Sequence, residues 1–168
     1  MRLILIFTCL LCSHCFICLS SDSTAFRNYF YKACNDKSSI RQFVVVTERY
    51  KQATSPILLC YQGAAEILKA RILINPYSKL SSFKKGKGMI DWACARDPTN
   101  IEIHYVRFCI QTNAPLFLKY NGEIVTDKTF ILKRWNKLSD EDLKKKIKKY
   151  MTLSKYCSIE EKAVFYKH

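Results

Sequence analysis

Few side chains in this sequence have the chemistry of a catalytic base. The chain has three histidines, of which His14 lies in an apolar N-terminal run and His168 is the last residue. His104 is therefore the main candidate, because histidine is the usual general base near neutral pH. Cys109 is a candidate nucleophile, but side chains five residues apart on a helix point in different directions. We expect His104 to be structural or at the surface, and we expect the protein not to be an enzyme.

The nine cysteines do not indicate a metal site. Four of them recur every third residue between Cys9 and Cys18, inside the same apolar run, where we interpret them as small apolar side chains. A zinc site needs several Cys or His ligands close together, whereas the other cysteines are widely spaced. We therefore expect no metal and no cofactor. Most of these five should be buried thiols, although one or two disulfides remain open and the pairing is not determined: Cys34, Cys60, Cys94, Cys109 and Cys157.

Lysine dominates the charge of the chain, whose formal net charge is +14. The segment from Lys69 to Lys87 contains six basic residues and no acid. Within it, Lys84, Lys85 and Lys87 alternate with glycine in a way that resembles a phosphate-binding loop, but the Walker spacing and its Ser or Thr are missing. These three lysines are our candidate polyanion-binding residues. The alternative is an ordinary solvated helix face.

Two charged residues, Glu102 and Arg107, lie in a mostly apolar segment around His104. With His104 they are our candidate partner-binding residues, as polar anchors that face a groove. The alternative, which we favour, is that they hold a neighbouring helix through a buried ion pair. Trp92 and Trp135 are interpreted as residues of the core or of a helix contact.

The N-terminus has the pattern of an export signal. Met1 and Arg2 precede an apolar run from Leu3 to Leu19, and Ser20 and polar residues follow it. Cleavage after Ser20 would leave residues 21–168 as a single domain, periplasmic or extracellular. Because the run is nearly long enough to span a bilayer, a retained membrane anchor is the alternative.

The mature chain shows mainly helical patterns, and its four glycines and four prolines are too few for a many-stranded sandwich. Helix starts are predicted at Ser55-Pro56, at Asn100, at Ser139 and at Ser158, each with a capping residue. A short strand is the alternative to helix at 43–46 and at 101–105, and Asn121-Gly122 favours a hairpin of strands over 116–125. The expected helices are 23–33, 38–50, 55–74, 78–96, 101–112, 125–135, 139–151 and 158–165.

The segment from Met89 to Asn100 resembles the end of a tetratricopeptide (TPR) repeat. Ala93 lies five residues before Pro98, and the small Gly86 lies seven before Ala93, as in that family. Three short sequence segments are also similar to segments of small exported bacterial proteins of unknown function: 75–77, 97–103 and 107–111. The resemblance implies an all-α fold of antiparallel helical hairpins stacked as a TPR-like bundle, with helix instead of hairpin at 116–125. It implies no catalytic residue.

These observations predict an exported, non-enzymatic interaction module that binds a protein or peptide partner on a helical surface. The alternative is a secreted basic protein that binds polyanions through lysine-rich faces: nucleic acid, an anionic envelope polymer or a lipid surface. Contact with a membrane is otherwise expected only if the signal is not cleaved.

Overall fold

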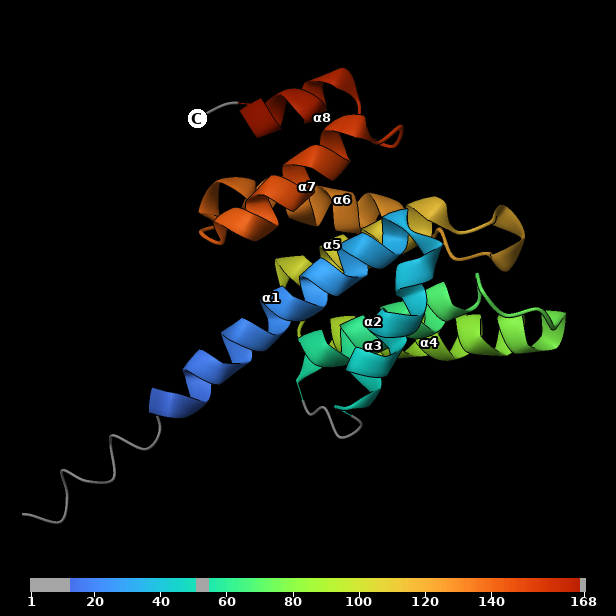
Figure 1. Cartoon of the computed structure of the whole chain (residues 1–168). Coiled ribbons are helices and arrows are strands. Elements are labelled where there is room, and N and C mark those ends of the chain that lie inside the picture. The colour runs from blue at the N-terminus through green and yellow to red at the C-terminus, as the bar shows by residue number, and fades with distance from the viewer. Residues whose placement is uncertain (1–12, 51–54, 167–168) are drawn as a thin grey trace, which may run out of the picture. The chain divides into compact units, whose positions relative to one another are not determined.

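The computed structural model describes residues 13–50 and 55–166, and every regular element in these ranges is a helix (Figure 1). The prediction of an all-α fold is thus confirmed. Both competing strands are helical instead, in α2 (Ile40–Glu48) and α5 (Ile101–Asn113). Of the predicted signal peptide, residues 1–12 lie outside the described part of the chain, and α1 (Ser13–Asn35) begins within it. Among the described residues, none of the helices combines the length and the apolar character that crossing a bilayer requires.

The chain divides into two compact units, one up to Met89 and one from Ile90. In the first unit, α1 packs against α2 and against α3 (Pro56–Lys69). Its core is a cluster of aromatic rings from these three helices, in which Phe30 lies 6.1 Å from Phe43 and 6.0 Å from Tyr61, between ring centroids. Burial of such large apolar side chains is the main stabilising term of a small helical unit.

The helices α3 and α4 (Pro76–Arg96) approach each other closely at two glycines. A Cβ atom on Gly86 would lie only 2.4 Å from the carbonyl oxygen of Gly63 and 2.7 Å from Cγ1 of Ile67. No larger residue fits at Gly86 without a shift of the backbone. Phe83, Gly86, Ile90 and Ala93 of α4 are buried, whereas Leu80 is exposed.

Two predicted helix boundaries in this region are displaced. Helix α3 ends at Lys69, five residues before the expected Ile74, because Ala70 and the residues after it close the helix in tight turns. Helix α4 begins at Pro76 and not at Ser78. The Asn75 side chain accepts hydrogen bonds from the backbone N–H groups of the first turn, and proline suits the first helical position.

The second unit is built around α5. Every residue from Glu102 to Gln111 is buried, and Asn100 caps the helix by accepting from the N–H groups of Glu102 and Ile103. Helix α6 (Ile124–Arg134) packs against it. The unit continues after α6 with the short helix η3 (Trp135–Lys137), with α7 (Glu141–Leu153), and with α8 (Ile159–Ala163), which leads into η4 (Val164–Tyr166).

The chain between α5 and α6 is helical and turned, not a hairpin of strands. A short 3-10 helix, η2 (Leu116–Leu118), ends at Lys119, which has a left-handed backbone conformation with φ 48°. Asn121-Gly122 then forms a turn before α6 starts at Ile124, one residue earlier than expected. Helix α7 is capped by Asp140 and not by Ser139. Helix α8 starts after Ser158 as predicted, and there Ser158 and Glu161 form a capping box.

The five cysteines from Cys34 to Cys157 are all free thiols in the described chain. Four are buried, as expected for small apolar side chains, and Cys34 is partly buried. Burial raises the pKa of Cys34 and of Cys94 to about 12, so both remain protonated at neutral pH.

Candidate functional site

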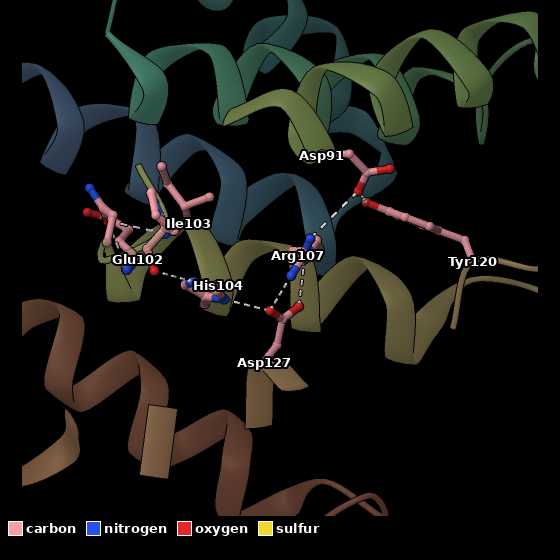
Figure 2. A network of polar contacts seen from close by, with 9 residues as sticks. Asp91, Glu102, Ile103, His104, Arg107, Tyr120 and Asp127 are labelled. Carbon is pink, nitrogen blue, oxygen red and sulfur yellow. Dashed lines mark hydrogen bonds and ion pairs between the residues drawn. The ribbon is translucent and has the colours of Figure 1, made fainter. Parts of the chain in front are cut away.

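The most polar part of the buried interior is centred on Asp127, which is completely buried. The Nε–H group of Arg107 donates to Asp127 Oδ2 at 2.8 Å, and its Nη2–H donates to Oδ1 at 2.7 Å. Nδ1 of His104 lies 2.6 Å from the same Oδ1 atom. Figure 2 shows the carboxylate of α6 between the two side chains of α5. Residues three apart on a helix share a face, which is why His104 and Arg107 meet one carboxylate.

The imidazole ring of His104 has contacts at both nitrogens and at its face. Its Nε2 atom lies 3.0 Å from the carbonyl oxygen of Pro98, and its ring stacks on Phe130 with centroids 3.9 Å apart. Both ring nitrogens therefore face acceptors, Asp127 and a backbone carbonyl. Neither nitrogen is directed at a nucleophile, so this His–Asp pair lacks the geometry of a hydrolytic triad.

The contacts extend to the connection between α5 and α6. The hydroxyl of Tyr120 donates to Asp91 Oδ1 at 3.0 Å, and the same carboxylate oxygen lies 3.9 Å from Nη1 of Arg107. Tyr120 is buried, although the residues before it are mostly exposed. The network thus joins the end of α4, the centre of α5, the start of α6 and the α5–α6 connection, all within the second unit.

Pairing with Asp127 keeps the Arg107 guanidinium charged. Burial by itself lowers the pKa of the Arg107 guanidinium, but the hydrogen bonds and negative charge of Asp127 outweigh it and raise that pKa above its ordinary value. Arg107 is therefore a cation at any pH at which the protein is folded. A buried carboxylate that receives a bidentate arginine is a strong, geometrically specific contact.

The three residues proposed as partner-binding are all buried: Glu102, His104 and Arg107. Their placement does not present them to a partner at the surface. For Arg107 it agrees with the favoured alternative, a buried ion pair to a neighbouring helix. Glu102 lies in the first turn of α5, where its backbone N–H is bound by the Asn100 cap.

Sequence reasoning missed Asp127, the acceptor that joins the network. A signal was present, because Ile124, Asp127 and Ile131 recur at helical spacing and both isoleucines are buried. An acid at such a position must find a buried cation, since an unpaired buried charge is very costly. Arg107 is the matching cation on a mostly apolar helix.

The three candidate polyanion-binding lysines lie on α4, and two of them, Lys84 and Lys85, are exposed. Nζ of Lys85 is 2.7 Å from Oε1 of Glu66, which also accepts from Ser82. Burial raises the pKa of the Glu66 carboxyl, but the hydrogen bonds from Lys85 and Ser82 outweigh it and hold the pKa below its usual value. Lys85 is thus already paired, which weakens this group as an anion site. No cluster of three potential metal ligands occurs in the described parts of the chain.

The α5–α6 connection, which Tyr120 links to the buried network, also carries exposed apolar side chains. Leu116 and Phe117 in η2 are 75% and 80% exposed, and Val125 in the first turn of α6 is 67% exposed. The connection extends beyond the ends of the two helices (Figure 1). We call these three side chains the apolar tip. Neither tryptophan belongs to it: Trp135 is buried against Phe165, as expected for a core residue, whereas Trp92 is half exposed beneath Arg96.

Comparison of the chain with protein-family models, with curated proteins and with solved structures finds no match.

Proposed function

We propose that this protein is an exported, non-enzymatic interaction module, and that it binds a protein or peptide partner through the apolar tip of the α5–α6 connection. One observation carries the proposal: Leu116 and Phe117 are neighbouring large apolar side chains and are at least three-quarters exposed. Exposed apolar groups of this kind mark interaction sites when they gather in one place. Aromatic side chains also supply a large share of the energy of protein interfaces.

The tip is held in place by its own local structure. Backbone hydrogen bonds from Leu118 to Pro115 and from Lys119 to Leu116 close the 3-10 turn, at 3.0 Å each. Tyr120 then returns to the interior and bonds Asp91, which ties the connection to the buried network. Because the connection is ordered before a partner arrives, binding costs less conformational entropy than ordering a loose segment would.

We also propose that the helix pairing is TPR-like. The close approach of α3 and α4 at Gly63 and Gly86 supports this, as do the complete burial of Ala93 and the end of α4 just before Pro98. In folds of this kind, helical hairpins offer their connections and concave faces to peptides. The polar side chains of α5 then position the site and do not contact the partner.

Affinity capture from the native envelope or medium tests the proposed function. The wild-type chain is compared with the double variant Leu116→Ser/Phe117→Ser and with a control, Ile74→Ser, which removes an even more exposed apolar side chain from the first unit. We expect the double variant to lose a partner that the control retains. Equal recovery of the same proteins by all three chains would refute the proposed site.

A further inference from the structure

A second surface, on α7, has a different chemistry. Five of the six residues from Lys144 to Lys149 are lysines, and the chain from Leu143 to Ile159 contains no acid. Leu143, Ile147 and Met151 form the buried stripe of this helix. The lysines therefore occupy its other faces, and Lys145 and Lys149, one turn apart, are exposed.

The carboxylates nearest to these lysines in the sequence already have partners. Glu141, the first residue of α7, lies 3.9 Å from Nζ of Lys144, and Glu160 of α8 accepts a hydrogen bond from the Ser158 hydroxyl. Asp142, in the first turn of α7, pairs with Lys146 four residues later. Glu161 of α8 lies 2.8 Å from Nζ of Lys128. Lys148 lies against the ring of Tyr166, with its Nζ 4.4 Å from the ring centroid. Helix α7 contains five lysines and two acids, and it therefore carries a net positive charge.

Large apolar side chains adjoin this cationic helix. Leu153, its last residue, and Ile159, the first residue of α8, are 78% and 83% exposed. Tyr166, which Lys148 contacts, is also exposed. A soluble anionic polymer would use the lysines but would gain nothing from exposed Leu and Ile. An anionic bilayer uses both, because its headgroups attract Lys while its interface accepts Leu, Ile and Tyr.

We propose that the outer surface of α7 and α8 binds the face of an anionic phospholipid bilayer. The residues that carry it are Lys145, Lys148, Lys149, Leu153, Ile159 and Tyr166. The lysines approach the lipid phosphates, and the apolar side chains enter the boundary between headgroups and acyl chains. This peripheral contact lies in the second unit and does not depend on the N-terminal apolar run.

Vesicle co-sedimentation of the full chain measures this contact. The quantity of interest is the ratio of the partition coefficients onto phosphatidylcholine vesicles with and without phosphatidylserine, because the apolar N-terminal run contributes to both. Each lysine near an anionic membrane strengthens binding roughly fivefold, so Lys145→Gln/Lys149→Gln should lower the ratio about 25-fold. The control Lys79→Gln/Lys84→Gln removes the same charge from exposed positions of α4 and should lower it much less.

A second variant separates lipid from soluble polyanions. Leu153→Ser/Ile159→Ser should weaken binding to the anionic vesicles severalfold and leave binding to heparin unchanged. Circular dichroism checks that each variant keeps the helical content of the wild type. The proposal is overturned if the two lysine pairs have equal effects. It is also overturned if the Leu and Ile substitutions change nothing, which would indicate a soluble polyanion as the ligand.

Discussion

Arg107 and Asp127 form the charge pair on which the packing of α5 against α6 depends. Removing two charges from water is expensive, and their attraction offsets this cost only when the geometry is good and the other hydrogen bonds are made. Both oxygens of Asp127 are engaged, by Arg107 and by His104. We infer that the pair contributes specificity to the arrangement of the two helices more than net stability.

Asp127→Asn should strongly destabilise the second unit, because it removes the buried, bidentate counter-charge of Arg107 and leaves only the more distant Asp91. The expected loss is about 3 kcal/mol or more in the free energy of unfolding. Urea unfolding followed by tryptophan fluorescence measures it in this unit alone, since both tryptophans, Trp92 and Trp135, lie there. The control Asp91→Asn removes a more exposed carboxylate 3.9 Å from Arg107 and should cost much less. Equal losses would mean that Asp127 is not the principal partner.

The network shows what residue patterns could and could not predict. The alternative of a buried ion pair at Arg107 followed from a lone charge on an apolar helix, and the structure contains one. Its acceptor, 20 residues away in sequence, could not be identified, because helical periodicity fixes the face of each helix but not which faces meet. The exposure of Leu116 and Phe117 could not be predicted for a similar reason, because the segment 116–125 also fitted a hairpin of strands.

Among the helix boundaries, those marked by a capping side chain were predicted best. Asn100 caps α5 and Ser158 opens α8 where expected, because side-chain caps and capping boxes are local. The end of α3 was misplaced because nothing in the sequence after Lys69 marks a stop until Asn75-Pro76. The start of α7 was misplaced by one residue because Ser139 and Asp140 are both good caps.

Substitution of glycine by alanine should have opposite effects on stability at two positions of α4. Gly86→Ala should destabilise the first unit by about 1–3 kcal/mol, because the added methyl group overlaps Gly63 and Ile67. Gly88→Ala meets nothing within 4 Å and should stabilise the helix by about 0.5–1 kcal/mol. Thermal unfolding followed by circular dichroism compares them. If both variants were stabilised, α3 and α4 would not be in close contact.

The link between α3 and α4 through Glu66 predicts acid sensitivity. Its pKa in the folded chain is lowered from 4.5, so its contribution to stability is fully present above about pH 4.5 and is lost as the pH falls through the lower folded value. The pKa of the Glu161 carboxyl in the second unit is also lowered, so its contribution to stability is likewise lost in acid. Stability of the Glu66→Gln variant, measured by urea unfolding between pH 3 and 6, should fall less steeply with acid than that of the wild type. An unchanged slope would show that Glu66 does not titrate in this way.

For the molecule as a whole, we propose an exported protein with two binding surfaces in its second unit: the apolar tip for a partner protein and the α7–α8 surface for anionic lipid. The proposal of export is based on the apolar N-terminal run of the sequence.

The proposed export predicts a mature chain that begins at Ser21. N-terminal sequencing of the protein recovered from the medium or envelope checks this, since the apolar run ends in the small residues around Ser20. Intact Met1 in a membrane fraction would instead identify a retained anchor.

Site-specific photo-crosslinking in the native cell tests the central claim most directly. A photoreactive amino acid is placed at Phe117 in the apolar tip and, as a control, at the more exposed Ile74 in the first unit. The account predicts a discrete crosslinked protein from position 117 that is absent from position 74 and disappears when Leu116 is also changed to Ser. No crosslink at position 117, or the same products from both positions, would contradict the assignment of the apolar tip as the partner-binding site.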